Sequence, residues 1–121
     1  MNIETRVKRI LVPMVRFKIV KEKKNNTRLG KIFGIYDNSP ENDSITICEN
    51  GISWTTNHNN IYVLFNDIKK TSIEGDKSSE NILIYLKNNQ IIKLPVRGKN
   101  GRFSDIFEFL RFLDRVLSEL K

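Results

Sequence analysis

The end of the chain predicts an amphipathic helix whose apolar face is wide for a surface helix. Ser104 is expected to cap it, with Asp105 in the first turn, where a carboxylate stabilises the helix dipole. At about 100° per residue, one apolar stripe is widened on one side, so that apolar residues cover more than half of the helix. The stripe contains Phe103, Ile106, Phe107, Leu110, Leu113, Leu117 and Leu120, and Phe109, Phe112 and Val116 widen it. The polar face is left to Glu108, Arg111, Arg115, Ser118 and Glu119.

Short blocks of alternating apolar and polar residues precede this helix and predict antiparallel strands with one buried face. Turn signals separate the blocks: Asn50-Gly51, where both residues tolerate positive φ, and Asn88-Asn89. Pro95 suits an edge strand or a bulge. The expected strands cover 15–19, 29–36, 45–47, 52–56, 61–65, 68–74, 82–87 and 91–97. The sequence therefore predicts a mainly β (α+β) fold of about seven antiparallel strands, closed by one helix over about 104–120.

Length and composition predict one domain, residues 1–121. A chain of 121 residues with 39% hydrophobic residues can bury a core without disulfides or metals. The single cysteine, Cys48, cannot form an intramolecular disulfide, which favours a cytoplasmic location. The apolar stretch near the N-terminus is broken by Pro13, Arg16 and Lys18, so it does not resemble a clear export signal or a membrane span.

The net charge of +7 is unevenly distributed along the sequence. Residues 1–31 carry ten Lys or Arg against two acids, and residues 37–80 carry eight acids against three Lys. Residues 87–102 add five more Lys or Arg and no acid. The molecule is therefore expected to present a basic N-terminal third and an acidic middle.

Three elements together resemble the pleckstrin-homology-like barrels, especially the small bacterial PH-like and GRAM-like proteins. They are Ile45-x-Ile47-x-x-Asn50-Gly51-Ile52, Ile61-x-Val63-x-Phe65-x-Asp67-Ile68, and the run Ile82-Leu83-Ile84-Tyr85-Leu86, followed by the closing helix. The resemblance covers roughly residues 44–121. It implies a barrel or two orthogonal sheets with the helix plugging one end, and binding of phospholipid headgroups, peptides or proteins without catalysis. Fold alone does not fix function, so this remains an analogy.

The residue types that enzymes need are scarce, and the sequence predicts no enzyme, no catalytic residues and no cofactor. Cys48 and His58 are the only Cys and His, and they are interpreted as a buried thiol and an exposed loop histidine rather than a nucleophile and its base. One Cys and one His cannot form a structural zinc site, so no metal is expected.

Anionic ligands are one class of expected partner. The predicted anion or lipid site consists of Lys21, Lys23, Lys24, Arg28, Lys99 and Arg102, the last two in a Gly-containing loop before the helix. The alternative interpretations are a solvated charged turn that protects a strand edge for the first four residues, and a flexible strand-to-helix connection for the loop with Lys99 and Arg102. Nucleic-acid binding is less favoured although the pI is 9.7, because most Phe residues fall on apolar phases and only Trp54 and Tyr62 remain for base stacking.

The favoured hypothesis is a non-enzymatic protein-binding module, such as a small adaptor or immunity (toxin-neutralising) protein. The acidic part of the predicted interface, Asp37, Glu41, Asp43, Glu49 and Asp67, would attract a basic partner such as a toxin. The apolar part is Phe109, Phe112 and Val116, which need cover from residues 1–14, from a partner or from self-association through the helix. The runner-up is peripheral binding to an anionic membrane surface or to phosphate groups.

Overall fold

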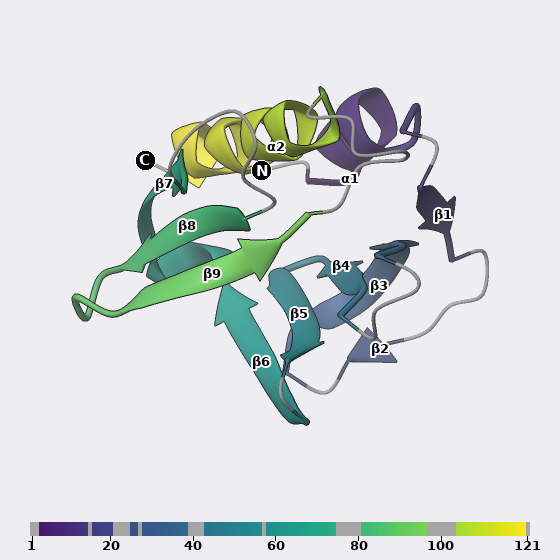
Figure 1. Ribbon diagram of the computed structural model, residues 1–121. Coiled ribbons are helices and arrows are strands. Elements are labelled where there is room, and N and C mark those ends of the chain that lie inside the picture. Colours follow the sequence, from purple (N-terminus) through teal and green to yellow (C-terminus); the bar gives the residue numbers. More distant parts are fainter. Residues whose placement is uncertain are drawn as a thin grey trace.

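The structure, a computed structural model, describes residues 3–14, 16–20, 25–26, 28–38, 43–56, 58–74, 81–96 and 104–120. Two antiparallel sheets lie beneath the C-terminal helix α2 (Ser104–Leu120), as Figure 1 shows. The chain begins with the helical elements α1 (Ile3–Arg6) and η1 (Val7–Leu11), the latter a wider π-helical turn. The strands are β1 (Phe17–Ile19), β2 (Asn25–Asn26), β3 (Gly30–Tyr36), β4 (Ile45–Cys48), β5 (Gly51–Thr56), β6 (Asn59–Leu64), β7 (Ile68–Ile73), β8 (Asn81–Leu86) and β9 (Ile91–Pro95).

A short 3-10 turn, η2 (Phe65–Asp67), joins the two sheets. The larger sheet has six strands in the order β1-β3-β4-β5-β6, with β2 also pairing with β3, and the smaller one has the order β7-β8-β9. Among the described residues, no strand pair links the sheets into a closed barrel. The predicted mainly β fold with a C-terminal helix is confirmed, in its two-sheet form.

The hairpin between β4 and β5 differs in its turn from the predicted one. Ile47 pairs with Ile52, so four residues separate the paired positions, and Gly51 already belongs to β5 without a positive φ. The glycine is needed for another reason. A Cβ at Gly51 would lie 2.1 Å from the carbonyl oxygen of Val63 on β6, which is far inside contact distance. The prediction of a two-residue turn at Asn50-Gly51 is therefore wrong. Close packing of β5 against β6, and not turn geometry, requires a glycine at this position.

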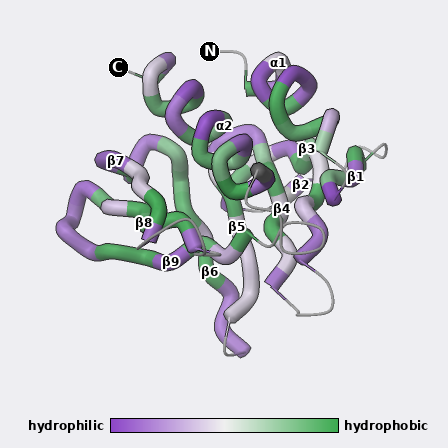
Figure 2. The backbone as a smooth tube through the Cα atoms, turned by 45° about the horizontal axis from the view of Figure 1, so that its top comes forward, coloured by the Kyte–Doolittle hydropathy of each residue, from purple (hydrophilic) through white to green (hydrophobic). Residues whose placement is uncertain are grey.

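Aromatic side chains connect α2 to the larger sheet and to the turn η2 between the sheets. Phe109 packs edge-on against Tyr36 of β3 with ring centroids 5.7 Å apart, and Phe112 packs likewise against Phe65 of η2 at 6.3 Å. Edge-to-face pairs at such separations add favourable quadrupole interactions to the burial of apolar area. One continuous core therefore spans the helix and the two sheets. Figure 2 shows hydrophobic and hydrophilic residues alternating along α2, as expected of an amphipathic helix.

The N-terminal helical segment and the two sheets together cover the wide apolar face of α2. Both α1 and η1 pack against α2, and Arg6 forms an ion pair with Glu119 near the C-terminal end of α2. The buried residues on this segment are Ile3, Val7, Ile10, Leu11 and Met14. The predicted interface residues Phe109, Phe112 and Val116 are all 0% exposed. The structure thus places this part of the predicted interface in the core, and the chain supplies the cover itself.

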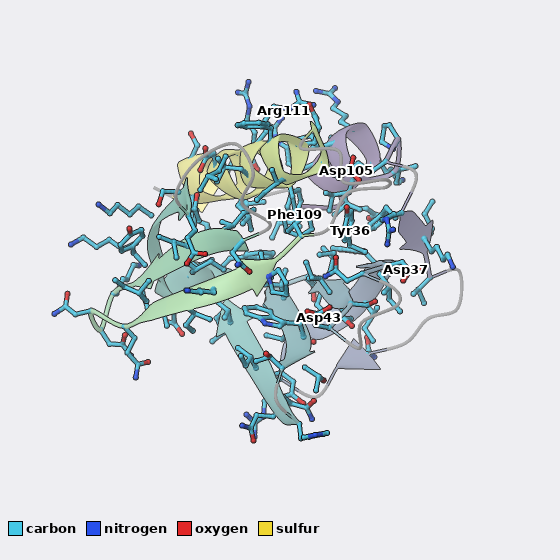
Figure 3. All side chains as sticks on the ribbon, in the orientation of Figure 1. Tyr36, Asp37, Asp43, Asp105, Phe109 and Arg111 are labelled. Atoms are coloured by element: carbon cyan, nitrogen blue, oxygen red, sulfur yellow. The ribbon has the colours of Figure 1, made fainter. Side chains whose placement is uncertain are left out.

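Two buried polar side chains connect distant elements. Tyr36 donates a hydrogen bond of 2.8 Å to Asp105 Oδ2 in the first turn of α2, and Figure 3 shows the pair beside Phe109. Burial, and then this bond to a carboxylate, raises the pKa of Tyr36 above its ordinary range. Asn38 donates through Nδ2 to the carbonyl oxygens of Asp43 and of Pro95, both at 2.9 Å. Because Pro95 lies on β9, Asn38 joins the two sheets.

No helix within the described part of the chain combines the length and the apolar character required to cross a bilayer.

Candidate functional site

The outer face of the larger sheet, turned away from the core, carries an ordered row of side chains. The strand register places Lys18 opposite Ile35, Ile35 opposite Thr46, Thr46 opposite Ser53, and Ser53 opposite Tyr62. Residues that face each other across antiparallel strands share one face of the sheet. These five residues, called the outer row, therefore cross β1, β3, β4, β5 and β6 in a line. Their neighbours Ile47, Ile52, Trp54 and Val63 point the other way, into the core.

Large apolar side chains remain exposed on this face. Ile35 is 37% exposed, Tyr62 38% and Leu64, two residues beyond Tyr62 on the same face of β6, 40%. Between Ile35 and Tyr62 lie hydroxyl groups, and a shallow hollow of about 190 Å³ is lined mainly by Ser44, Thr46, Ser53, Thr55, Asn60 and Tyr62. Thr55 Oγ1 donates a hydrogen bond of 2.7 Å to Asn60 Oδ1 at its edge. The surface combines apolar contact area with many hydrogen-bonding groups.

Cations lie at both ends of the outer row. The Arg28 guanidinium carbon is 4.7 Å from the centroid of the Tyr62 ring, within the range of a cation–π interaction. At the other end, Lys18 Nζ lies 3.6 Å from Asp37 Oδ2, which offsets its charge. Arg28 belongs to the predicted anion or lipid site, whereas Lys21, Lys23, Lys24, Lys99 and Arg102 lie outside the described residues. That site, and membrane or phosphate binding with it, remains a prediction.

The predicted acidic interface is not one patch. Asp37 directly precedes Asn38, whose side chain donates to the Asp43 carbonyl oxygen, so both acids lie at the end of the β3–β4 pair where Tyr36 faces Ile45. Glu49 lies beyond the other end of this pair, four residues after Ile45, which corresponds to about 13 Å at roughly 3.3 Å per strand residue. Asp67 lies in η2, where the two sheets join. Glu41 falls outside the described residues. The structure brings two of the five acids together and keeps Glu49 and Asp67 apart from them.

Cys48 and His58 are separated by the length of β5, since Cys48 precedes this strand and His58 follows it. Six strand residues correspond to about 20 Å, too far for a proton transfer between the two side chains. Cys48 is 0% exposed, and burial raises the pKa of its thiol to about 11. In the part of the chain that the structure describes, no cluster of three or more His, Cys, Asp or Glu is arranged for a metal ion.

The Cys48 thiol is expected to be unreactive in the folded protein. A pKa of about 11 lowers its thiolate fraction at neutral pH by roughly 100-fold relative to an ordinary thiol, and burial adds a barrier to access. Reaction with a chromogenic disulfide reagent should therefore be slow in buffer and complete at once in strong denaturant. Equal rates under the two conditions would contradict the burial of Cys48.

Trp54 and Tyr62, the two aromatic residues left over for base stacking, have opposite environments. Trp54 is 3% exposed, so it cannot stack on a base, whereas Tyr62 lies in the outer row. Of these two residues only Tyr62 is exposed, and its ring beside Arg28 is a small stacking surface for a nucleic acid. Nucleic-acid binding consequently stays a less favoured prediction.

Comparison of the chain with known protein families, curated proteins and solved structures finds no match. The resemblance to PH-like barrels therefore stays a prediction, and the function has to be argued from the surface itself.

Proposed function

We propose that this chain is a non-enzymatic protein-binding module, of the kind represented by small adaptor or immunity proteins, and that it contacts its partner with the outer face of the larger sheet. The observation that carries the proposal is the outer row, where exposed Ile35 and Tyr62 flank hydroxyl groups. The opposite side of the same sheet faces the core. A rigid sheet with one free, partly apolar face is a suitable platform for a partner.

The composition of this face fits a protein partner better than a small molecule. Tyr is enriched at interfaces because its ring buries a large area while its hydroxyl group can still form a hydrogen bond. The hollow over Ser53 is shallow and mainly polar, unlike the deep apolar pockets that usually hold small ligands. Since the acids do not form one patch, the uncharged middle of the outer row, from Ile35 to Tyr62, supports binding more strongly than electrostatic attraction of a basic toxin does.

Site-specific photo-crosslinking tests the proposal. A photoreactive amino acid replaces Ser53 in the outer row, and in the control it replaces Ser118, which is exposed on α2. We expect one protein to be crosslinked in the producing cell from Ser53 and not from Ser118. The purified partner should then bind Ile35→Lys at least about tenfold more weakly than the unmodified chain, because a charge would be buried at the contact.

Two results would contradict this proposal. One is crosslinking of the same protein from Ser118 as efficiently as from Ser53. The other is a purified partner that binds Ile35→Lys as tightly as the unmodified chain, which would place the contact elsewhere on the surface.

A further inference from the structure

The free edges of the two sheets differ in how they are protected against pairing with another strand. Edge strands are usually blunted by short length, lysine, proline or a bulge. The edge strand β1 has three residues and contains Lys18, and β9 contains Lys93 and Pro95. The remaining edge of the smaller sheet, β7, contains Lys69 and Lys70, with a break in register there.

Strand β6 has none of these features. Its six residues, Asn59 to Leu64, contain no charge and no proline, and all six pair with β5 without a bulge. Among the described strands, β5 alone pairs with β6, so its other edge is open. Figure 1 shows the start of β6 on the opposite side of the molecule from both helices. This edge therefore presents a regular, neutral set of backbone hydrogen-bonding groups.

The register identifies which backbone groups are free. Phe65 N donates to the Asn50 carbonyl oxygen at 2.9 Å, next to the pair formed by Leu64 and Gly51. Hydrogen-bonded and non-hydrogen-bonded pairs alternate along antiparallel strands, so Val63 and Ile61, two and four residues before Phe65, exchange hydrogen bonds with Ile52 and Trp54 of β5. Asn60, Tyr62 and Leu64 then direct their N–H and C=O groups to the open edge.

We infer that the β6 edge pairs with the β6 edge of a second copy of this chain, antiparallel, with Tyr62 opposite Tyr62 of the second copy. Asn60 of each copy then faces Leu64 of the other, and all outward N–H and C=O groups of the three residues find partners. The same register places Ile61 opposite Val63 on the inner face. The two outer faces join into one continuous surface.

Charge favours a second copy at the β6 edge over the β1, β7 and β9 edges, and the uncharged strand β2 has only two residues. Like charges opposite each other destabilise strand pairing. Pairing of β1, β7 or β9 with its own copy would bring lysines of the paired strands together, whereas β6 itself contributes only Asn, Ile, Tyr, Val and Leu. The one cation in contact with Tyr62 among the described residues, Arg28, lies over the face of its ring and not in the strand. One strand buries less than the roughly 800 Å² per partner of standard interfaces, so a weak dimer is expected.

Sedimentation velocity of the purified full chain, from micromolar to near-millimolar concentration, tests this inference without any other partner. The unmodified chain should shift from monomer toward dimer. Tyr62→Lys should dimerise at least about tenfold more weakly, because two lysines would meet at the symmetry axis. Ile35→Lys, which adds the same charge to the same face away from the edge, should dimerise like the unmodified chain.

Leu64→Lys is a second edge variant, should Tyr62→Lys fail to fold as judged by circular dichroism. Hydrogen exchange of the unmodified chain needs no variant, and the amides of Tyr62 and Leu64 should become protected as concentration rises. A chain that stays monomeric throughout overturns the inference, and so do edge variants that dimerise normally or amides whose exchange is independent of concentration. None of these outcomes bears on the crosslinking test, because that test requires a different protein.

Discussion

Leu11→Asp is expected to lose most or all of its native structure. Leu11 is 0% exposed in η1, which packs against α2 in the same core as Phe112. An aspartate there would bury a carboxylate without a partner and remove the apolar contact as well, at a cost of about 4 kcal/mol or more. Typical domains are stable by only about 5–15 kcal/mol, so the urea midpoint followed by circular dichroism should fall sharply.

Arg9→Asp is the matched control for this substitution. Arg9 belongs to the same turn but is exposed, so the change in charge is larger while no core contact is lost. Its midpoint should lie close to that of the unmodified chain. If Leu11→Asp were as stable as Arg9→Asp, the N-terminal segment would not cover α2 in the way described.

Asn38→Ala is expected to destabilise the fold by about 2–4 kcal/mol. The substitution removes the Nδ2 donor to the carbonyl oxygens of Asp43 and Pro95, which would lose this partner at a site where Asn38 itself is 0% exposed. Because Pro95 belongs to β9, the contact between the two sheets is weakened too. Urea unfolding at constant pH measures the loss.

Asn38→Asp separates the donor role from side-chain shape. Aspartate has nearly the same shape but replaces the donating amide with a second acceptor that faces two carbonyl oxygens, so it should be at least as destabilising as alanine. Asn66→Ala, at an exposed asparagine in η2, is the control and should change stability by less than about 0.5 kcal/mol. A similarly small effect of Asn38→Ala would show that the amide does not join the sheets.

The strands and the last helix were predictable because their signals are local. The α2 helix spans the residues expected from its apolar spacing, and the Asn88-Asn89 hairpin lies where the turn signal placed it, with Asn89 at a φ of 71°. The N-terminal helix was missed. Ile3, Val7, Ile10, Leu11 and Met14 recur at helical spacing, but frequent charges and Pro13 obscured the pattern in so short a segment.

The candidate surface was less predictable than the fold, because it depends on register between strands far apart in sequence. Ser53 and Thr46 are ordinary outward residues when each strand is read alone. Only the pairing of β3 with β4, and of β5 with β6, aligns them between Ile35 and Tyr62. Similarly, the charge of the middle segment did not reveal that Glu49 and Asp67 lie apart from Asp37 and Asp43.

The chain covers the apolar face of α2 itself and leaves Ile35, Tyr62 and Leu64 exposed on the outer face of the larger sheet. Hydroxyl-radical footprinting of the unmodified protein tests both parts in one measurement. Phe107, 46% exposed on α2, and Tyr62, 38% exposed in the outer row, should be oxidised readily, whereas Phe109 and Phe112, both 0% exposed, should be protected until the protein unfolds. Oxidation of Phe109 and Phe112 as fast as Phe107 in the folded protein would contradict their burial beneath α2.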